Sequence, residues 1–174
     1  MQAEYLAGQV KLIILDVDGV LTDGGLYYDR TGQSMKRFHV QDGLGIKMAA
    51  STGLQFAVIT GLDSPAVAQR VTELGITHYF PGYLRKMPIL HDLVTTTGIA
   101  LEEMAYVGDD WVDATPMSKV GFPVAVANAR PEILQLAAWV TTAMGGQGAV
   151  RETIDFILRA QGTFEALWQN WLQG

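Results

Sequence analysis

The sequence predicts an α/β protein with a Rossmann-like parallel sheet covered by helices on both faces. Two observations lead to this fold class. Short, continuously apolar runs recur along the chain, as expected for strands that are buried on both faces. Segments with apolar residues at three-to-four spacing lie between these runs, as expected for helices that cover a sheet. Alternation of this kind is typical of a parallel sheet.

The apolar runs predict strands at residues 11–15, 55–60, 104–107 and 122–126, with a possible fifth at 139–142. The helical patterns predict helices at residues 43–52, 65–74, 86–97 and 130–138. Pro65 and Pro131 stand near the predicted starts of two of these helices. A first helical turn tolerates proline, because its backbone N–H groups have no partner within the helix.

One segment breaks the alternation directly after the first strand. Residues 26–28 and 35–40 flank the turn-forming residues 29–32, which predicts a β-hairpin inserted at about 24–40. A lone hairpin is marginally stable in water, so we expect it to pack on something, such as another subunit. The chain 1–174 is predicted to be a single domain.

The tail, at about residues 161–174, carries an apolar stripe at helical spacing. Two interpretations stay open for it. The tail docks on the body of its own chain, or it lies at a subunit interface or over the site of a neighbouring subunit. The stripe consists of Phe164, Leu167, Trp168, Trp171 and Leu172.

Composition and charge exclude several classes of function. The 12 basic and 18 acidic residues give a formal net charge of −6, which argues against general binding of nucleic acid or of an anionic membrane. The chain has no cysteine, so disulfides, zinc–thiolate sites and a thiolate nucleophile are excluded. No secretory signal is evident, and no apolar stretch approaches the about 20 residues needed to span a bilayer. We therefore expect a cytoplasmic protein.

Polar residues follow three of the predicted strands. Asp16 and Asp18 come after the first strand, Thr60 ends the second, and Asp109 with Asp110 follows the third. In open parallel sheets, ligands bind at the carboxyl ends of the strands. The three strand ends together predict a binding site, although each one alone indicates little more than a turn.

Asp16 and Asp18 are the candidates for catalysis. A carboxylate at a strand end can attack phosphorus and form an aspartyl phosphate, which makes Asp16 the candidate nucleophile. A second carboxylate two residues later can protonate the leaving oxygen and then activate water, which makes Asp18 the candidate acid and base. Gly19 lets backbone N–H groups approach phosphate oxygens closely. The competing interpretation is a plain turn after a strand.

The density of acidic residues calls for a cation beside an anionic substrate. Hard oxygen ligands suit Mg²⁺, which keeps several waters and takes a phosphate oxygen. We expect the protein ligands to be the side chains of Asp16 and Asp109 and the backbone carbonyl of Asp18. Asp110 and Asp113 are expected to support these ligands. Asp113 has an equally simple alternative role, in which it complements a helix dipole.

Two further positions are candidates for holding the phosphoryl group. Thr60 offers a hydroxyl, and Gly61 offers an open backbone N–H. Lys86, at the start of a predicted helix, can neutralise charge that develops on the transferring group. The alternatives are a plain exit from a strand for the first pair and a solvated surface lysine for Lys86.

The order of these residues resembles the haloacid dehalogenase superfamily of phosphotransferases. Four motifs carry the resemblance: Asp16-Val17-Asp18-Gly19-Val20-Leu21-Thr22, Thr60-Gly61, Lys86, and Gly108-Asp109-Asp110-Trp111-Val112-Asp113. Residues 21–24, 38–47 and 145–152 extend the similarity over about 10–160 and point to a branch of small, nearly capless phosphatases that act on sugar-acid phosphates. In keeping with this resemblance, no large insertion is present where a cap domain would sit.

The resemblance implies the roles of the matching residues and the partners of the protein. It implies a Mg²⁺-dependent phosphomonoesterase acting on a sugar-acid phosphate such as 3-deoxy-D-manno-octulosonate 8-phosphate. It also implies a homotetramer in which hairpins form a central barrel and neighbouring subunits help to close each site. Asp42 and Lys47 lie in a region that faces substrate in this branch. Their alternatives are a helix cap for Asp42 and a solvent-facing position for Lys47.

The sequence departs from this branch at positions where a cation is usual. Leu62 and Gln147 stand where arginine is usual, and Leu84 precedes Arg85 where the branch often has an extra basic residue. Arginine grips a carboxylate through two parallel hydrogen bonds, so these departures favour a different or less acidic sugar phosphate. The sequence also leaves open a nonulosonate phosphate as the substrate, a phosphomutase reaction, and a non-catalytic tetrameric binding protein that retains the fold.

Overall fold

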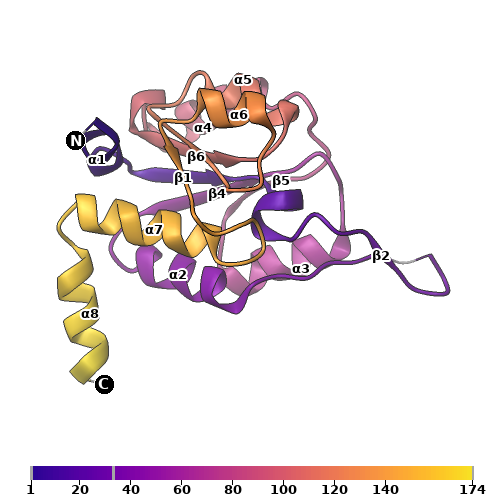
Figure 1. Ribbon diagram of the computed structural model, residues 1–174, viewed down its shortest axis with the longest axis horizontal. Coiled ribbons are helices and arrows are strands. Elements are labelled where there is room, and N and C mark those ends of the chain that lie inside the picture. The colour runs from indigo at the N-terminus through magenta and orange to yellow at the C-terminus, as the bar shows by residue number, and fades with distance from the viewer. Residues whose placement is uncertain (1, 33, 174) are drawn as a thin grey trace.

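A computed structural model describes residues 2–32 and 34–173 of the chain. Its centre is a six-stranded parallel sheet with the strand order β5-β4-β1-β6-β7-β8, which confirms the predicted fold class (Figure 1). The strands of this sheet are β1 (Leu12–Leu15), β4 (Gln55–Ile59), β5 (His78–Phe80), β6 (Met104–Gly108), β7 (Phe122–Ala125) and β8 (Trp139–Val140).

Helices cover both faces of the sheet. In Figure 1, α2, α3 and α7 lie below the sheet, and α4, α5 and α6 lie above it. The helices are α1 (Gln2–Gly8), α2 (Val40–Ala50), α3 (Pro65–Leu74), α4 (Met87–Thr97), α5 (Ala114–Met117), α6 (Pro131–Leu136), α7 (Ala149–Ala160) and α8 (Phe164–Gln173). Shorter helical segments are η1 (Val17–Leu21), η2 (Leu101–Glu103) and η3 (Trp111–Asp113). Among the described residues, no helix is long and apolar enough to span a bilayer.

The predicted strands and helices are present, with changes at their ends. The helix predicted at 65–74 matches α3, whereas α2 begins at Val40, three residues before the predicted start. Strand β5 was not predicted, because its three residues are only half-buried and have no continuous apolar pattern. The fifth predicted strand is confirmed as β8, but only two of its residues pair with β7.

Strand β1 is the centre of the core. All four of its residues have no exposed surface, and burial of each large aliphatic side chain contributes about 1.5–3 kcal/mol to stability. Its last residue, Leu15, is in register with Val58 of β4 and with Val107 of β6. The chain therefore leaves all three strands at the same level of the sheet, on the same edge.

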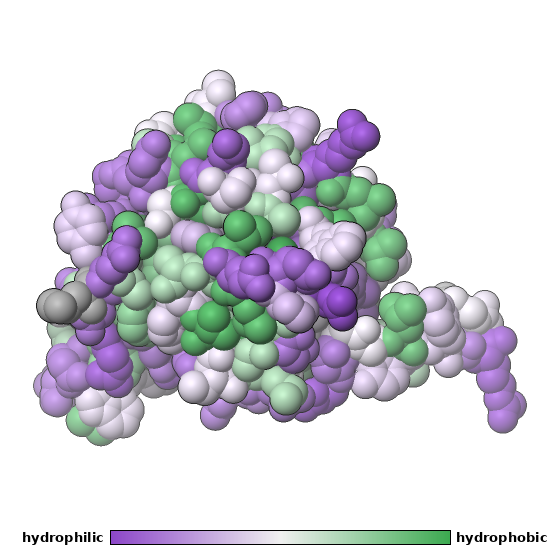
Figure 2. All heavy atoms as spheres, turned by 45° about the horizontal axis from the view of Figure 1, so that its top comes forward, coloured by the Kyte–Doolittle hydropathy of each residue, from purple (hydrophilic) through white to green (hydrophobic). Residues whose placement is uncertain are grey.

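The predicted hairpin is present but shorter than expected. Strand β2 (Tyr27–Tyr28) pairs with β3 (Ser34–Met35), and Gln33 lies outside the described residues. The prediction of a strand through residues 35–40 was wrong, because β3 ends at Met35 and Val40 already begins α2. The hairpin stands away from the body, so the sheet offers no neighbouring strand that would lengthen it (Figures 1 and 2).

The tail forms α8, which extends away from the body of the protein (Figure 1). Phe164 and Leu167 pack against the edge of the core, whereas Trp168, Trp171 and Leu172 are about half exposed. The first turns of α8 thus dock on the same chain, as one interpretation predicted. The exposed remainder of the stripe leaves the second interpretation open.

A glycine-containing loop before α7 packs closely on the segment that follows β1. Gly146 N–H donates to the carbonyl of Val20 at 2.9 Å, and Gly145 N–H donates to Asn128 Oδ1 at 2.9 Å. A Cβ atom on Gly145 would lie 1.6 Å from the carbonyl oxygen of Gly19. Because backbone atoms stand on both sides of this contact, neither side can move aside cheaply.

We predict that Gly145→Ala destabilises the protein, because the added methyl group would overlap the backbone at Gly19. Overpacking of this kind typically costs about 1–3 kcal/mol, which thermal or urea unfolding measures readily. Gly8→Ala is the matched control, since its added methyl group would lie no closer than 3.5 Å to its nearest neighbour. Equal stabilities of the two variants would contradict the close packing of this loop.

Candidate active site

Asp16 is the first residue after β1, and its backbone N–H still donates to the carbonyl of Val107 in β6. Beyond it, Asp18 has an extended backbone and Gly19 has φ 93°, so the chain turns sharply away from the sheet. A Cβ atom on Gly19 would lie 2.1 Å from a carboxylate oxygen of Asp109. Glycine is needed here for both its positive φ and the closeness of Asp109.

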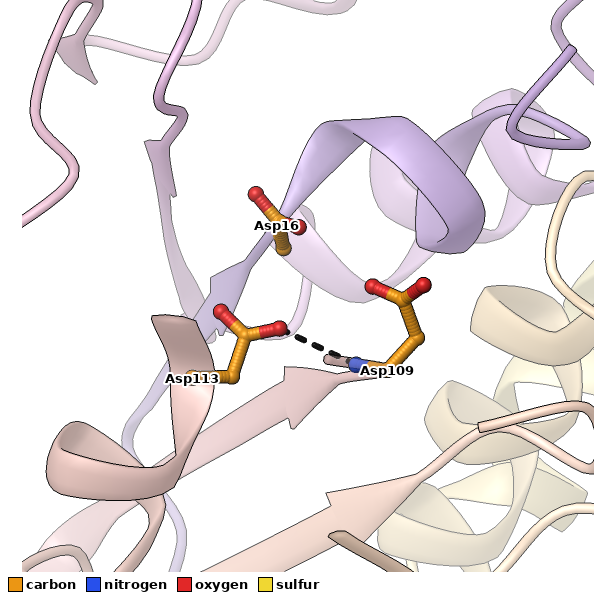
Figure 3. A group of neighbouring side chains, drawn as sticks. All are labelled: Asp16, Asp109 and Asp113. Atoms are coloured by element: carbon orange, nitrogen blue, oxygen red, sulfur yellow. Dashed lines mark hydrogen bonds between the residues drawn. The ribbon is translucent and has the colours of Figure 1, made fainter. Parts of the chain in front are cut away.

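Three carboxylates meet at this edge of the sheet. Asp16 follows β1, Asp109 follows β6, and Asp113 ends η3 (Figure 3). One oxygen of each lies within 4.8 Å of an oxygen of the other two. The backbone N–H of Asp109 donates to Asp113 Oδ2 at 3.0 Å, which fixes the loop after β6 against η3.

Lys86, just before α4, brings a buried ammonium into this group. Its Nζ donates to Asp16 Oδ1 at 2.9 Å, to Asp113 Oδ1 at 2.7 Å and to the hydroxyl of Tyr106 at 2.9 Å. An ammonium has three donors, so these three contacts use its full capacity. Lys86 can bind a phosphoryl oxygen only if it releases one of these partners.

The burial of these charges changes their protonation. Burial and the nearby Asp113 carboxylate raise the pKa of Asp16 to about 7, although Lys86 opposes the shift. Burial together with Asp16 and Asp113 raises the pKa of Asp109 to about 8. For Lys86, burial alone lowers the pKa, but the carboxylates of Asp16 and Asp113 outweigh it and raise the pKa.

The residues at this edge fit a divalent cation. Asp109 Oδ1 is buried and has no hydrogen-bond partner, which is costly for a carboxylate unless a cation occupies the space beside it. Both oxygens of Asp113 already accept hydrogen bonds, which suits the predicted supporting role. Oxygen donors without histidine or cysteine are the ligands that Mg²⁺ prefers.

A cavity of about 220 Å³ opens beside these carboxylates. This volume is below the about 300–1,000 Å³ of pockets that enclose a drug-sized ligand, so it suits a phosphoryl group with the rest of the substrate at the mouth. The lining residues include most of the predicted site and also Leu62, Leu84 and Val112: Asp16, Asp18, Thr60, Gly61, Leu62, Leu84, Asp109, Asp110 and Val112.

Thr60 and Gly61 reach the cavity as predicted, at the end of β4. The Thr60 side chain is buried, and its hydroxyl accepts a hydrogen bond from the backbone N–H of Leu62 at 3.4 Å. Asp110 lines the cavity but is exposed, and its carboxylate accepts the N–H of Trp111 at 2.7 Å. It therefore caps the start of η3 and supports the loop that carries Asp109.

The structure does not bring Asp42 and Lys47 to this cavity. Asp42 is buried between α2 and α7, and its Oδ1 accepts the backbone N–H of Arg151 at 2.8 Å. It thus caps the first turn of α7, because the first N–H groups of a helix have no partner within the helix. Lys47 is exposed on α2. Within one chain, Asp42 is therefore a helix cap and Lys47 faces solvent, which are the alternatives given for these residues from the sequence.

Two residues of the site were missed by the sequence reasoning. Tyr106 lies within the fully buried strand β6, and its hydroxyl donates to Asp113 Oδ1 at 2.7 Å. A tyrosine inside an apolar strand could have signalled this, since a buried hydroxyl needs a partner. Lys36 forms an ion pair with Asp18. Nothing in its spacing indicates this, because the hairpin separates the two residues.

The chain is similar in sequence and in structure to known proteins. Residues 79–152 match the family model of haloacid dehalogenase-like hydrolases. The chain is 45% identical over 159 residues to the 3-deoxy-D-manno-octulosonate 8-phosphate phosphatase of Escherichia coli K12, an alignment that covers 91% of this chain and 85% of the relative.

Two solved structures are also similar. A 3-deoxy-D-manno-octulosonate 8-phosphate phosphatase from Yersinia pestis has a TM-score of 0.93 and 41% identity, covering 94% of this chain and 89% of that one. The enzyme of the same name from Moraxella catarrhalis, in complex with a magnesium ion, a phosphate ion and a KDO molecule, has a TM-score of 0.95 and 38% identity, covering 98% of both chains.

We predict that the metal-free protein loses stability as the pH rises. The Asp109 carboxyl has a pKa of about 8 in the folded protein and about 3.9 in an unfolded chain. At pH values between these two, the carboxyl is protonated in the folded protein and ionised in the unfolded chain. Stability therefore falls between these two values. Asp109→Asn should raise the melting temperature of the metal-free protein, more at about pH 8.5 than at about pH 5.5.

Mg²⁺ should raise the melting temperature of the wild type at the higher pH and have little effect on Asp109→Asn, since ligand binding stabilises only a protein that retains its site. Asp92→Asn is the control, because it changes an exposed carboxylate on α4 that does not line the cavity. A gain for Asp109→Asn that does not change with pH, together with full protection by Mg²⁺, would contradict this assignment.

Proposed function

The chain belongs to the haloacid dehalogenase-like hydrolases, and we propose that residues 1–174 form one Mg²⁺-dependent phosphatase domain that hydrolyses 3-deoxy-D-manno-octulosonate 8-phosphate. The observation that carries the proposal is the placement of Asp16. It lies at the carboxyl end of the central strand, bonded to Lys86 and beside the unpartnered oxygen of Asp109. The relatives that share this fold over most of their length are named for this substrate.

The proposed reaction has two steps. An oxygen of Asp16 attacks phosphorus, and the bond between phosphorus and the leaving oxygen breaks as Asp18 donates a proton to that oxygen. Asp18 then takes a proton from water, whose oxygen attacks phosphorus and releases phosphate from Asp16. Both carboxylates line the cavity, so both can reach one phosphoryl group.

Several other groups of the chain support these steps. Lys86 holds Asp16 in place through Oδ1, and Thr60 with Gly61 offers a hydroxyl and a backbone N–H to the phosphoryl oxygens. Asp16, Asp109 and the backbone carbonyl of Asp18 would hold Mg²⁺. When bound, Mg²⁺ would shield these carboxylates and neutralise negative charge on the phosphoryl group.

The uncharged residues at the mouth of the cavity favour a neutral sugar phosphate as a second candidate substrate. Leu62 and Leu84, both more than half exposed, line the cavity at positions where the branch usually carries a cation. Gln147, where the branch usually has arginine, is exposed and lies outside the cavity lining. A neutral sugar phosphate needs no such cation, so it is the alternative substrate for the same catalytic residues.

We expect a phosphate-release screen with Mg²⁺ to show a preference for the octulosonate phosphate. Its kcat/KM should exceed that of neutral hexose phosphates by at least about tenfold, which corresponds to about 1.4 kcal/mol. EDTA should abolish release from both. A preference for the neutral esters would replace the proposed substrate and leave the chemistry in place.

The same screen tests the nucleophile. Asp16→Asn should lower turnover by at least about 10³-fold, as loss of a covalent nucleophile generally does. Asp92→Asn, which changes an exposed carboxylate on α4, is the control. Turnover by Asp16→Asn close to that of the wild type would rule out the aspartyl-phosphate route.

We also propose that the protein is a cytoplasmic homotetramer assembled through its hairpins. Leu26, Tyr28 and Met35 are each more than half exposed on a hairpin that stands clear of the body (Figure 2). Apolar side chains gathered on a lone hairpin favour burial against other copies.

Light scattering after size exclusion should therefore give four chain masses for the wild type and a smaller particle for the double variant Leu26→Ser/Tyr28→Ser. Leu136→Ser, which changes an exposed leucine on α6, should leave the mass unchanged. A monomeric wild type, or a tetrameric double variant, would exclude assembly through the hairpin. Cell fractionation tests the location.

A further inference from the structure

We propose that Lys36 is a positioning residue that directs the proton of Asp18 toward the leaving group. This inference rests on the proposed function, because it assigns a role to Lys36 only if Asp18 acts as acid and base. None of the four motifs that carry the family resemblance contains Lys36. Its contact with the candidate acid is a feature of the folded chain.

The first observation is the contrast between Lys36 and its neighbours in the chain. Ser34, Met35 and Arg37 are exposed, whereas the Lys36 side chain is only 3% exposed. Its ammonium donates to Asp18 Oδ1, and the Asp18 side chain is 30% exposed and lines the catalytic cavity. The base of the hairpin thus turns one cation inward, onto the candidate acid.

The second observation is the set of bonds that fixes this placement. Thr22, after the turn that carries Asp18, forms an isolated antiparallel bridge with Phe38. The Thr22 hydroxyl accepts the N–H of Gly19 at 3.4 Å and the N–H of Gly24 at 3.2 Å. The segments before and after the hairpin are therefore joined at its base. This junction holds the hairpin beside the turn of Asp18.

The chemical consequence concerns which oxygen of Asp18 carries a proton. An ammonium has donors and no acceptor, so the oxygen that it contacts must act as an acceptor. With Lys36 on Oδ1, a proton on the Asp18 carboxyl is placed on Oδ2. The terminal torsion of an aspartate side chain is soft, so without Lys36 the carboxyl group can rotate and the proton can sit on either oxygen.

This placement fits the proton balance of the proposed reaction. In the first step, the proton moves from Oδ2 to the leaving oxygen as its bond to phosphorus breaks, which leaves an alcohol and an Asp18 carboxylate. In the second step, Oδ2 takes a proton from the attacking water and is ready for the next cycle. Lys36 keeps its own protons throughout and stays bonded to Oδ1.

The competing explanation is that Lys36 only stabilises the fold. A buried ammonium needs a partner, and loss of a buried pair destabilises a protein whatever its function. The two explanations differ in how they depend on the leaving group. A poor leaving group such as an alkoxide needs the proton from Asp18, whereas 4-nitrophenolate departs with little help. A general loss of stability would affect both esters alike.

The test compares Lys36→Met with the wild type on two esters in Mg²⁺. For the octulosonate phosphate, an alkyl ester, we expect kcat/KM to fall by about 10–10²-fold, a part of the about 10²–10⁴-fold that acid–base catalysis supplies. For 4-nitrophenyl phosphate, we expect a fall of less than about threefold. Lys36→Arg, which keeps a cationic donor, should recover part of the loss on the alkyl ester.

Arg30→Met is the matched control, because it removes an exposed cation from the turn of the same hairpin and should change neither rate. Equal losses on both esters, or no loss on either, would overturn the role of Lys36. In an Asp18→Asn background, Lys36→Met should have no further effect, and a further alkyl-specific loss there would also overturn it. A wild type that hydrolyses neither ester would instead refute the proposed function itself.

Discussion

The buried contact between Lys86 and its two carboxylates is the interaction on which the rest of the site depends. Lys86 directly precedes α4, Asp16 follows β1 and Asp113 ends η3, so one ammonium joins three elements that are distant in the chain. Removing one partner of such a pair typically costs about 3–5 kcal/mol, because it leaves a charge that is buried and uncompensated. The same contact that holds the candidate nucleophile therefore also holds the edge of the sheet together.

The parallel register of β1, β4 and β6 provides the second constraint. It sets Asp16, Thr60 and Asp109 at one edge, while the positive φ of Gly19 turns the chain out of the sheet three residues after the candidate nucleophile. The loop at Gly145 closes on this turn from the other side. The loop at Gly145 thus holds the turn that carries Asp18, and a candidate acid needs support of this kind to keep its orientation.

Much of the fold and the centre of the site could be predicted from the sequence. Buried parallel strands leave a distinctive apolar pattern, and residues that directly follow them must share an edge. Less could be predicted where position depends on a neighbour in space. The sequence around Asp42 suits a substrate contact or a helix cap equally well. Its carboxylate accepts the N–H of Arg151 only because α7 packs against α2 in the folded chain.

The sequence by itself determined the strand–helix alternation and the group of Asp16, Asp18, Thr60 and Asp109, because these depend on short-range patterns and on the ends of buried strands. Only the tertiary structure decided that the Tyr106 hydroxyl accepts a hydrogen bond from Lys86 and that Lys36 forms an ion pair with Asp18. The physical reason is that a buried polar group must find its partner wherever the fold places one, and that partner need not be near in sequence.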